Sequence, residues 1–282
     1  MKIIIRKLLF WIGLGKIVRI YRRYMFAKSY YRSQLKMIRV WAFKDTEDTN
    51  FYYDLDDLNI DQIIHAVSII TNTETKIIEG YIKEIKSDAW LKNLISNNLK
   101  SSNYPKDIKI EFSRRIGWYA VARATKPKVI VETGVHNGVG ACVLTRALMK
   151  NNEEGALGQY FGTDIDKSAG QLLSAPLSYY GKILYGDSLE SLAKFNHNID
   201  LFINDSDHSA SYEQREYETV NAKLASSAII LGDNSHVTDE LSKFSIKNKR
   251  NFLFIPEKPK DHWYPGAGIG VSYTIAQHKG VA

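Results

Sequence analysis

The chain has 282 residues, of which 44% are apolar and 12% are aromatic. This is enough for one sizeable hydrophobic core and a smaller appendage. Cys142 is the single cysteine, so the sequence excludes an intramolecular disulfide framework and favours a reducing, cytoplasmic setting. The net charge of +7 is unevenly distributed, because residues 1–44 hold 12 Lys and Arg and no Asp or Glu. The remainder of the chain is mildly acidic.

Residues 1–50 are predicted to form a basic amphipathic arm. The longest apolar run, residues 8–15, is too short to cross a bilayer, and it lacks the small-residue cleavage site of a secretory signal. A helix with basic residues opposite an apolar side would suit an anionic membrane surface at the inner membrane face. That apolar side would hold Ile5, Leu8, Leu9, Trp11 and Ile12. The alternative is packing on its own domain or on a second copy, in a homo-oligomer; a nucleic-acid partner is disfavoured.

Residues 51–107 are predicted to form a helical cap. Apolar residues recur there at helical spacing in two groups, Ile60, Ile63, Ile64 and Val67, then Ile77, Ile78, Tyr81, Ile82 and Ile85. The polar residues 96–107 mark the boundary with a third segment, residues 108–282, which is the expected catalytic domain.

From Lys128 onward, short β-rich runs alternate with helical segments. The runs lie at residues 129–132, 160–163, 182–186, 200–204 and 228–232. This alternation predicts an α/β fold, with a doubly wound, mostly parallel sheet and helices on both faces. Ligands of such sheets bind beyond the carboxyl ends of the strands.

Glycines and polar residues follow the first three predicted strands. Gly134, Gly138 and Gly140 allow a tight turn close to a ligand, but their spacing matches neither the dinucleotide-binding loop nor the phosphate loop. Asp164 ends the second run, where a carboxylate can accept hydrogen bonds from two ribose hydroxyls. Asp187 and Ser188 follow the third run, where polar groups can read an adenine edge. The three strand ends suit an adenosine-containing ligand without a pyrophosphate.

The order of the motifs "VIVETGVHNGVG", "YFGTDID", "ILYGDSLESL" and "DLFINDSDH" resembles the class I S-adenosylmethionine-dependent methyltransferases over roughly residues 110–275. The resemblance implies a Rossmann-like, seven-stranded sheet with a reversed last strand. It also implies that Glu132, Gly134 and Gly138 form the loop beside the methionine part of the cofactor. Asp164 would then hold the ribose, and Asp187 with Ser188 would lie near the adenine.

Asp205 follows the fourth run, and Asp233 with Asn234 follows the fifth. Two carboxylates and an amide oxygen at one sheet edge suit Mg²⁺ or a similar divalent cation. This arrangement resembles the cation-dependent O-methyltransferases, in which a basic side chain lies three positions beyond the first ligand. Here that position is His208, a competent general base at neutral pH, and the "DSDH" form resembles a subgroup that methylates sugars or secondary metabolites. Asp207 either orients the imidazole or serves as a spare ligand.

Several alternatives remain open for the function. Asp and Asn after strands are also common turn formers. The predicted function is O-methylation of a hydroxyl on a glycan or sugar-containing acceptor; the alternatives are a small aromatic or polyketide acceptor and a non-catalytic scaffold that keeps the fold. Transfer to a nucleobase amine is disfavoured, because the sequence after the fourth run is "NDSD" with no nearby proline.

Overall fold

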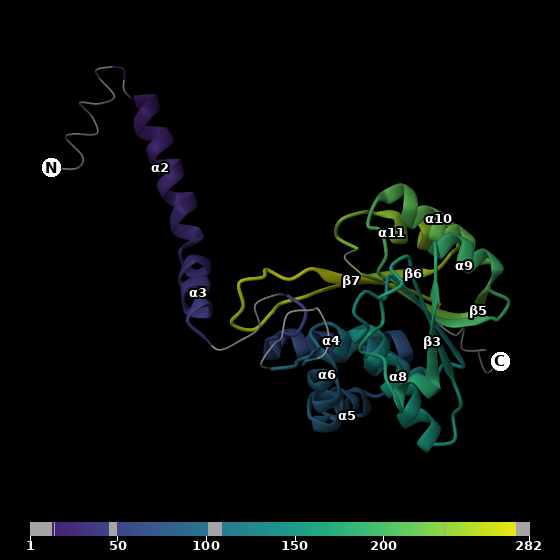
Figure 1. Cartoon of the computed structure of the whole chain (residues 1–282). Coiled ribbons are helices and arrows are strands. Elements are labelled where there is room, and N and C mark those ends of the chain that lie inside the picture. Colours follow the sequence, from purple (N-terminus) through teal and green to yellow (C-terminus); the bar gives the residue numbers. More distant parts are fainter. Residues whose placement is uncertain (1–12, 14, 45–49, 101–108, 234, 275–282) are drawn as a thin grey trace, which may run out of the picture. The chain divides into compact units, whose positions relative to one another are not determined.

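The computed structural model describes residues 13, 15–44, 50–100, 109–233 and 235–274 (Figure 1). It divides into two compact units, one formed by the amino-terminal segment to Asp45 with residues 261–263, and the other by the rest of the chain. The apolar helix side expected at Ile5 to Ile12 lies outside the described residues, and so does Asn234.

The first unit holds two helices, α2 (Gly15–Tyr30) and α3 (Arg32–Ala42). Near the end of α3, the indole of Trp41 lies edge-on to the rings of His262 and Trp263, with centroids 5.7 and 6.1 Å away. Most large apolar side chains of α2 are exposed to solvent. Among the described residues, no helix combines the length and the apolar character that spanning a membrane requires.

The second unit is built on a seven-stranded sheet with the order β3-β2-β1-β4-β5-β7-β6. The strands are β1 (Val129–Thr133), β2 (Gln159–Asp164), β3 (Gly181–Tyr185), β4 (Ile199–Asn204), β5 (Leu224–Asp233), β6 (Asn251–Pro256) and β7 (Gly268–Tyr273). Neighbours among β1 to β5 pair in parallel, whereas β7 runs antiparallel to β5 and β6. The predicted doubly wound, mostly parallel sheet with a reversed last strand is therefore confirmed.

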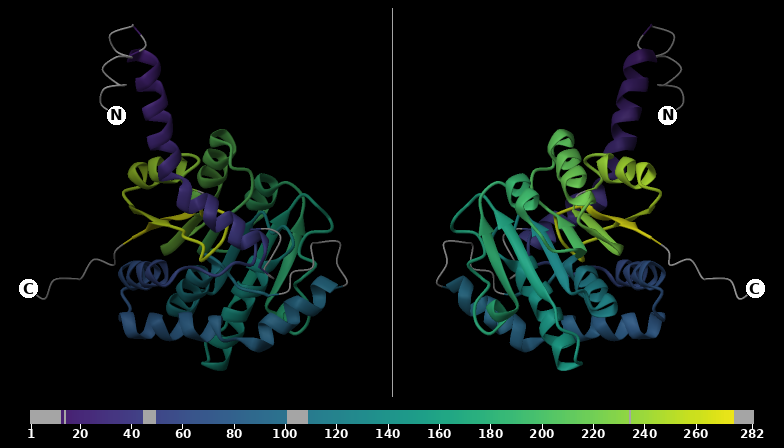
Figure 2. Two further views of the ribbon diagram at one scale, coloured as in Figure 1. Left: turned by 90° about the vertical axis from the view of Figure 1, so that its left-hand side faces the viewer. Right: turned by 90° about the vertical axis from the view of Figure 1, so that its right-hand side faces the viewer.

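Helices cover both faces of this sheet (Figure 2). One face carries α4 (Asp57–Thr71), α5 (Thr75–Lys86), α6 (Ala89–Lys100), α7 (Arg115–Thr125) and α8 (Val139–Glu153), and the other carries α9 (Ser188–Lys194), α10 (Ala210–Asn221) and α11 (Glu240–Lys247). Successive strand residues point to opposite faces. Ile130 and Leu201 therefore join the hydrophobic core under α4 to α8, while Val131 and Phe202 join the core under α9 to α11. The short 3-10 helix η1 (Leu177–Tyr180) precedes β3.

The start of α4 is fastened to the end of β6. The side-chain amide of Asn59 donates to the carbonyl of Pro256 at 2.7 Å, and its oxygen accepts from the N–H of Lys258 at 2.9 Å. Asp56 caps α4 by accepting from the N–H of Asn59 and also donates its own N–H to the carbonyl of Lys258. The helices of the expected cap thus belong to the same compact unit as the sheet.

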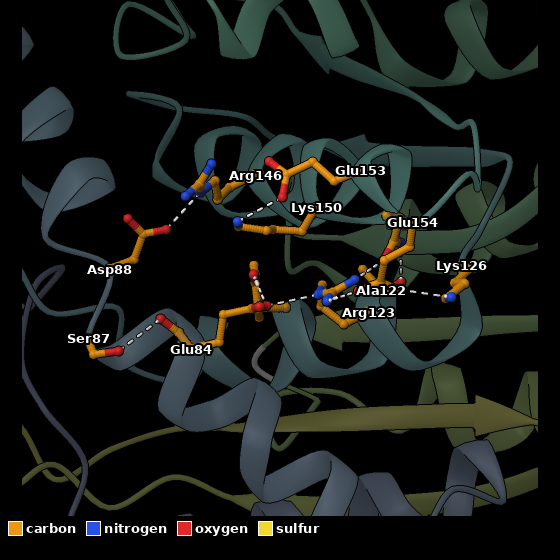
Figure 3. A network of polar contacts seen from close by, with 12 residues as sticks. Glu84, Ser87, Asp88, Ala122, Arg123, Lys126, Arg146, Lys150, Glu153 and Glu154 are labelled. Atoms are coloured by element: carbon orange, nitrogen blue, oxygen red, sulfur yellow. Dashed lines mark hydrogen bonds and ion pairs between the residues drawn. The ribbon is translucent and has the colours of Figure 1, made fainter.

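Buried ion pairs join the helices on the first face (Figure 3). Arg123 on α7, only 3% exposed, donates to Glu84 on α5 at 2.9 Å and to Glu154 after α8 at 2.6 Å. A separate pair joins Arg146 on α8 to Asp88 before α6 at 2.7 Å. These bonds fix the orientation of helices whose apolar sides alone would permit sliding.

Candidate active site at the carboxyl edge of the sheet

A cavity of about 480 Å³ opens beyond the carboxyl ends of β1 to β4. Its size lies in the usual range for small-molecule sites. Four of the residues predicted to bind a cofactor line it, namely Gly134, Asp164, Asp187 and Ser188. Asp205, the predicted metal ligand after the fourth run, also lines it. Glu132 and Gly138 are not among its lining residues. The parallel strands therefore bring four distant sequence motifs to one cavity.

Gly134 makes the turn after β1 possible. Its φ is +80°, and a Cβ atom added there would lie 2.0 Å from the carbonyl oxygen of Asp205. The obstacle is backbone and cannot move aside, because the N–H of Asp205 is bonded to the carbonyl of Thr133 at 2.9 Å. Only glycine fits between these two strand ends.

Gly138 has a different role at the start of α8. Its φ is +97°, and a Cβ there would lie 3.0 Å from the Cα of Gly170. It therefore allows the loop after β2 to pack against the first turn of α8, outside the cavity.

Asp164 is held by the loop backbone so that its carboxylate faces the cavity. One oxygen accepts from the N–H of His136 at 2.8 Å and the other from the N–H of Asp166 at 2.9 Å. Each carboxylate oxygen keeps acceptor capacity for a hydroxyl of a bound ligand. Beside it, the ring of His136 stacks on Phe51, with centroids 5.2 Å apart, and burial lowers the pKa of this histidine.

Asp187 and Ser188 line the cavity but are also engaged in the fold. Asp187 caps α9 by accepting from the N–H groups of Leu189 and Glu190 at 2.8 and 3.2 Å. The Ser188 hydroxyl donates to the buried carboxylate of Glu216 and lies 2.9 Å from the hydroxyl of Tyr212. These bonds orient both predicted adenine-side groups before any ligand binds.

Glu132 lies beneath the glycine turn. It is 1% exposed and accepts a hydrogen bond from the Tyr160 hydroxyl at 2.6 Å. A Cβ at Gly140 would lie 2.3 Å from its Oε1 atom, so this glycine makes room for the carboxylate. Burial raises the pKa of Glu132 to about 7. The predicted cofactor-loop residue therefore supports the loop from below and does not face the ligand.

Asp205, which lines the cavity, lies close to His208 and Asp233. One ligand atom from each lies within 4.8 Å of the others, so the carboxyl groups of Asp205 and Asp233 are close neighbours. Burial and the neighbouring Asp233 carboxylate raise the pKa of Asp205 well above its usual range. The convergence of the fourth and fifth strand ends follows from the parallel order β4-β5.

The imidazole of His208 lies between two acidic groups. Its Nε2 atom is 3.8 Å from Asp205, and its Nδ1 atom is 3.5 Å from Glu213 on α10. The Glu213 carboxylate is the main cause that raises the pKa of His208. One carboxylate oxygen of Asp207 accepts from the N–H of Ser209 just before α10 at 2.8 Å. Asp207 also lines the cavity, and its two predicted roles stay predictions.

Asp233 is paired with Arg114, which the sequence analysis did not identify. The guanidinium donates to both carboxylate oxygens, from Nε and, at 2.7 Å, from Nη2. Burial acts to raise the pKa of Asp233, but Arg114 holds it below the usual range. Arg114 precedes α7 and is 119 residues away in sequence, so no local motif signals the pair.

These side chains do not fit a divalent cation. Mg²⁺ prefers several oxygen ligands in near-octahedral geometry, but both oxygens of Asp233 already accept from a guanidinium. Asn234 lies outside the described residues. Asp205 and an imidazole remain, and an imidazole suits Mg²⁺ poorly. We therefore derive no chemical step through a metal.

Residues 131–235 match the model of a methyltransferase domain. This segment runs from β1 to just beyond β5 and contains the cavity and the acidic cluster. No curated protein sequence matches the chain. The match supports a methyltransferase domain in the central strands, in agreement with the predicted enzyme class.

Solved methyltransferase structures are similar in fold. One from Geobacter sulfurreducens is 17% identical with a TM-score of 0.50, covering 72% of this chain and 98% of its own. The O-methyltransferase TomG from Streptomyces achromogenes, in complex with SAM, is 12% identical (TM-score 0.49; 68% and 92% covered). An O-methyltransferase from Bacillus cereus, in complex with SAH, is 14% identical with a TM-score of 0.48, covering 67% of this chain and 93% of its own. The Geobacter protein confirms the Rossmann-like methyltransferase fold.

Proposed function

We propose that this protein is an S-adenosylmethionine-dependent O-methyltransferase whose cofactor binds in the cavity beyond β1 to β4. The observation that carries the proposal is that Asp164 and Asp205 line one cavity. The proposed ribose-binding carboxylate and one member of the cluster of Asp205, His208 and Asp233 therefore border the same cavity. Asp164 would accept the ribose hydroxyls, the backbone at Gly134 would approach the methionine part, and Asp187 with Ser188 would border the adenine.

His208 is the proposed general base. Glu213 beside Nδ1 favours the tautomer with the proton on that nitrogen, which leaves Nε2 as the basic atom. Nε2 would take the proton of the acceptor hydroxyl as its oxygen attacks the methyl group that the bound cofactor supplies. Glu213, 3.5 Å from Nδ1, would then stabilise the imidazolium. General-base catalysis of this kind typically contributes about 10²- to 10⁴-fold.

The proposed acceptor is a hydroxyl of a glycan or sugar-containing molecule at an anionic membrane surface. Support comes from α2, where one stripe at helical spacing holds Ile17, Ile20, Tyr21 and Tyr24, each between 57% and 62% exposed. Lys16, Arg19, Arg22 and Arg23 follow the opposite side of the same helix. An apolar stripe beside a basic side, with no acidic residue from Gly15 to Lys44, is typical of a helix lying in the headgroup region of anionic lipids.

The cofactor site can be tested before any acceptor is known, by thermal unfolding with and without S-adenosylhomocysteine. At about a hundredfold over the dissociation constant, binding adds roughly 2.7 kcal/mol, which raises Tm by about 5 to 10 °C. We expect Asp164→Ala to lose the shift. Asp61→Ala, which removes an exposed carboxylate on α4, is the matched control and should keep it. Absence of a shift in the unmodified protein at millimolar ligand would favour the non-catalytic scaffold.

A further inference from the structure

The pair of carboxylates at the ends of β4 and β5 already has a cation. Both oxygens of Asp233 accept from the guanidinium of Arg114, and a carboxylate oxygen of Asp205 lies within 4.8 Å of one of Asp233. The pair is almost completely enclosed, since the side chain of Arg114 is 11% exposed and that of Asp233 is 0% exposed. The positive charge is therefore built into the fold at the position where the sequence pattern predicted a metal.

Arg114 is fixed from its other side by Glu257, which follows β6. The backbone N–H of Arg114 donates to Glu257 at 3.2 Å, and its Nη1 lies 3.6 Å from the second carboxylate oxygen. Glu257 also accepts from the hydroxyl of Tyr53 and from the N–H of Ala267 at 3.2 Å. If the guanidinium moved away, two buried carboxylates would lose their counter-charge. This arrangement disfavours a swing that would vacate the site for a metal ion.

We infer that Arg114 is the resident cation of the Asp205–Asp233 pair and that this site works without a divalent metal. Asp233 would have to release a guanidinium before it could ligate an ion, and the ion would then lie beside a fixed positive charge. Arg114 is a positioning residue: it orients Asp233, whose carboxylate lies within 4.8 Å of that of Asp205. The carboxyl of Asp205 in turn lies 3.8 Å from Nε2 of His208. The consequence for catalysis rests on the proposed function, whereas the metal-binding behaviour does not.

The test is Mn²⁺ binding to the full-length protein, followed by electron paramagnetic resonance without cofactor or acceptor. Mn²⁺ accepts the same oxygen ligands as Mg²⁺. We expect the unmodified protein to bind no stoichiometric Mn²⁺ at concentrations of about 1 mM, the weak end of protein oxygen sites. Arg114→Ala, which leaves two carboxylates without a counter-charge, should gain one site per chain. Adding Asp205→Asn to that variant should remove the site again.

Two further variants separate charge from structure. Arg114→Lys retains a cation and should gain no Mn²⁺ site. Arg146→Ala removes a buried arginine–carboxylate pair with the same 11% exposure of the arginine, but it leaves one carboxylate and not two, so it also should gain none. If Arg114→Ala does not fold, Arg114→Gln, which keeps the chain length without the charge, takes its place.

Two results would overturn the inference. One is a Mn²⁺ site in the unmodified protein, tighter than about 100 μM, that disappears in Asp233→Asn. The other is a folded Arg114→Ala variant that shows the S-adenosylhomocysteine shift yet gains no Mn²⁺ site. Failure of the proposed methyltransferase function would instead appear as the absence of that shift in the unmodified protein, whatever the metal result.

Discussion

The Nδ1 atom of His208 lies 3.5 Å from the carboxylate of Glu213, five positions further along the chain. Because this carboxylate is the main cause of the raised pKa of His208, Glu213→Gln should lower that pKa toward its ordinary value of 6.5. The neutral imidazole is the active base, so methyl transfer should rise with pH through a value above 6.5 in the unmodified protein and through a lower value in the variant. NMR titration of the His208 ring measures the change without an acceptor.

The same titration has a consequence for stability. A histidine whose folded pKa is raised contributes stability that is fully present below the unfolded pKa and is lost as pH rises through the folded value. Glu213→Gln should therefore lose stability mainly at acid pH. Glu218→Gln, at an exposed site on the same helix, is the control, and an equal change of the His208 pKa in both variants would contradict the assignment of Glu213.

Glu132→Gln should change how stability depends on pH. The folded pKa of Glu132 is about 7, against 4.5 without burial, so between these values the folded chain keeps a proton that the unfolded chain releases. Stability from this group is therefore lost as pH rises from about 4.5 to 7, by at most roughly 3 kcal/mol. Gln can still accept from Tyr160 and does not ionise. Urea unfolding should show that the free energy of unfolding falls less between pH 5 and pH 8 in the variant than in the unmodified protein. An equal fall in both proteins would refute the interpretation of Glu132 as a buried acid.

Gly134→Ala should lower the free energy of unfolding far more than the strain of a positive φ alone would. Gly155 provides the comparison, because its φ of +83° is similar but nothing lies within 4 Å of an added Cβ. We expect Gly155→Ala to lose about 1 kcal/mol and Gly134→Ala about 3 kcal/mol or more, because its Cβ meets the Asp205 backbone. Chemical denaturation measures both. Gly134→Ala should also abolish the S-adenosylhomocysteine shift, and similar costs at both positions would show that the turn relaxes.

Reversal of three arginines on one side of α2 should abolish membrane binding. The variant is Arg19→Glu, Arg22→Glu and Arg23→Glu, and the assay is cosedimentation with vesicles containing phosphatidylglycerol. Charge attraction adds about 1 kcal/mol per basic residue near such a surface, so binding should fall by on the order of a hundredfold. Vesicles of phosphatidylcholine alone should bind weakly in every case.

The control for this experiment carries the same change of net charge on the other unit. Lys76, Arg215 and Lys249 are exposed and lie on separate surface elements, so their replacement by Glu should leave vesicle binding largely intact. An equal loss in both triple variants would reduce the effect to net charge. Unchanged vesicle binding of the α2 variant with an altered mass in solution would show that α2 is an interface between copies.

The sequence predicts those parts of the site that follow directly from strand ends. Asp164 and Asp205 could be placed together because each ends a β-rich run and parallel strands align their carboxyl ends. The family resemblance implies that Glu132 belongs to the cofactor loop, whereas strand alternation predicts that its side chain points into the core, where the structure has it 1% exposed. It shares parity with Ile130, whose side chain joins the core under α7 and α8.

Arg114 could not be predicted because no local pattern connects it to its partner. It lies in the turn before α7, whereas Asp233 and Glu257 follow β5 and β6, and the packing of α7 alone brings the three together. The predicted metal ligands Asp205 and Asp233 do lie close together, but the arginine that pairs with Asp233 has no local sequence signal. The role of Asp207 depended on side-chain direction, which adjacency in sequence does not specify.

The hydrogen bonds from Asn59 to Pro256 and Lys258 also constrain how the protein folds during its synthesis on the ribosome. The partners are 197 and 199 residues apart, so the start of α4 is synthesised long before β6, whose end it contacts. In a nascent chain that ends before β6, Arg114 lacks its contact with Glu257. The start of α4 likewise lacks its hydrogen bonds to Pro256 and Lys258. Closing so distant a contact is slow, and the early helices stay exposed to aggregation until it forms. The synthesis of β6 and the segment after it therefore completes the contacts that hold α4 and Arg114 in place.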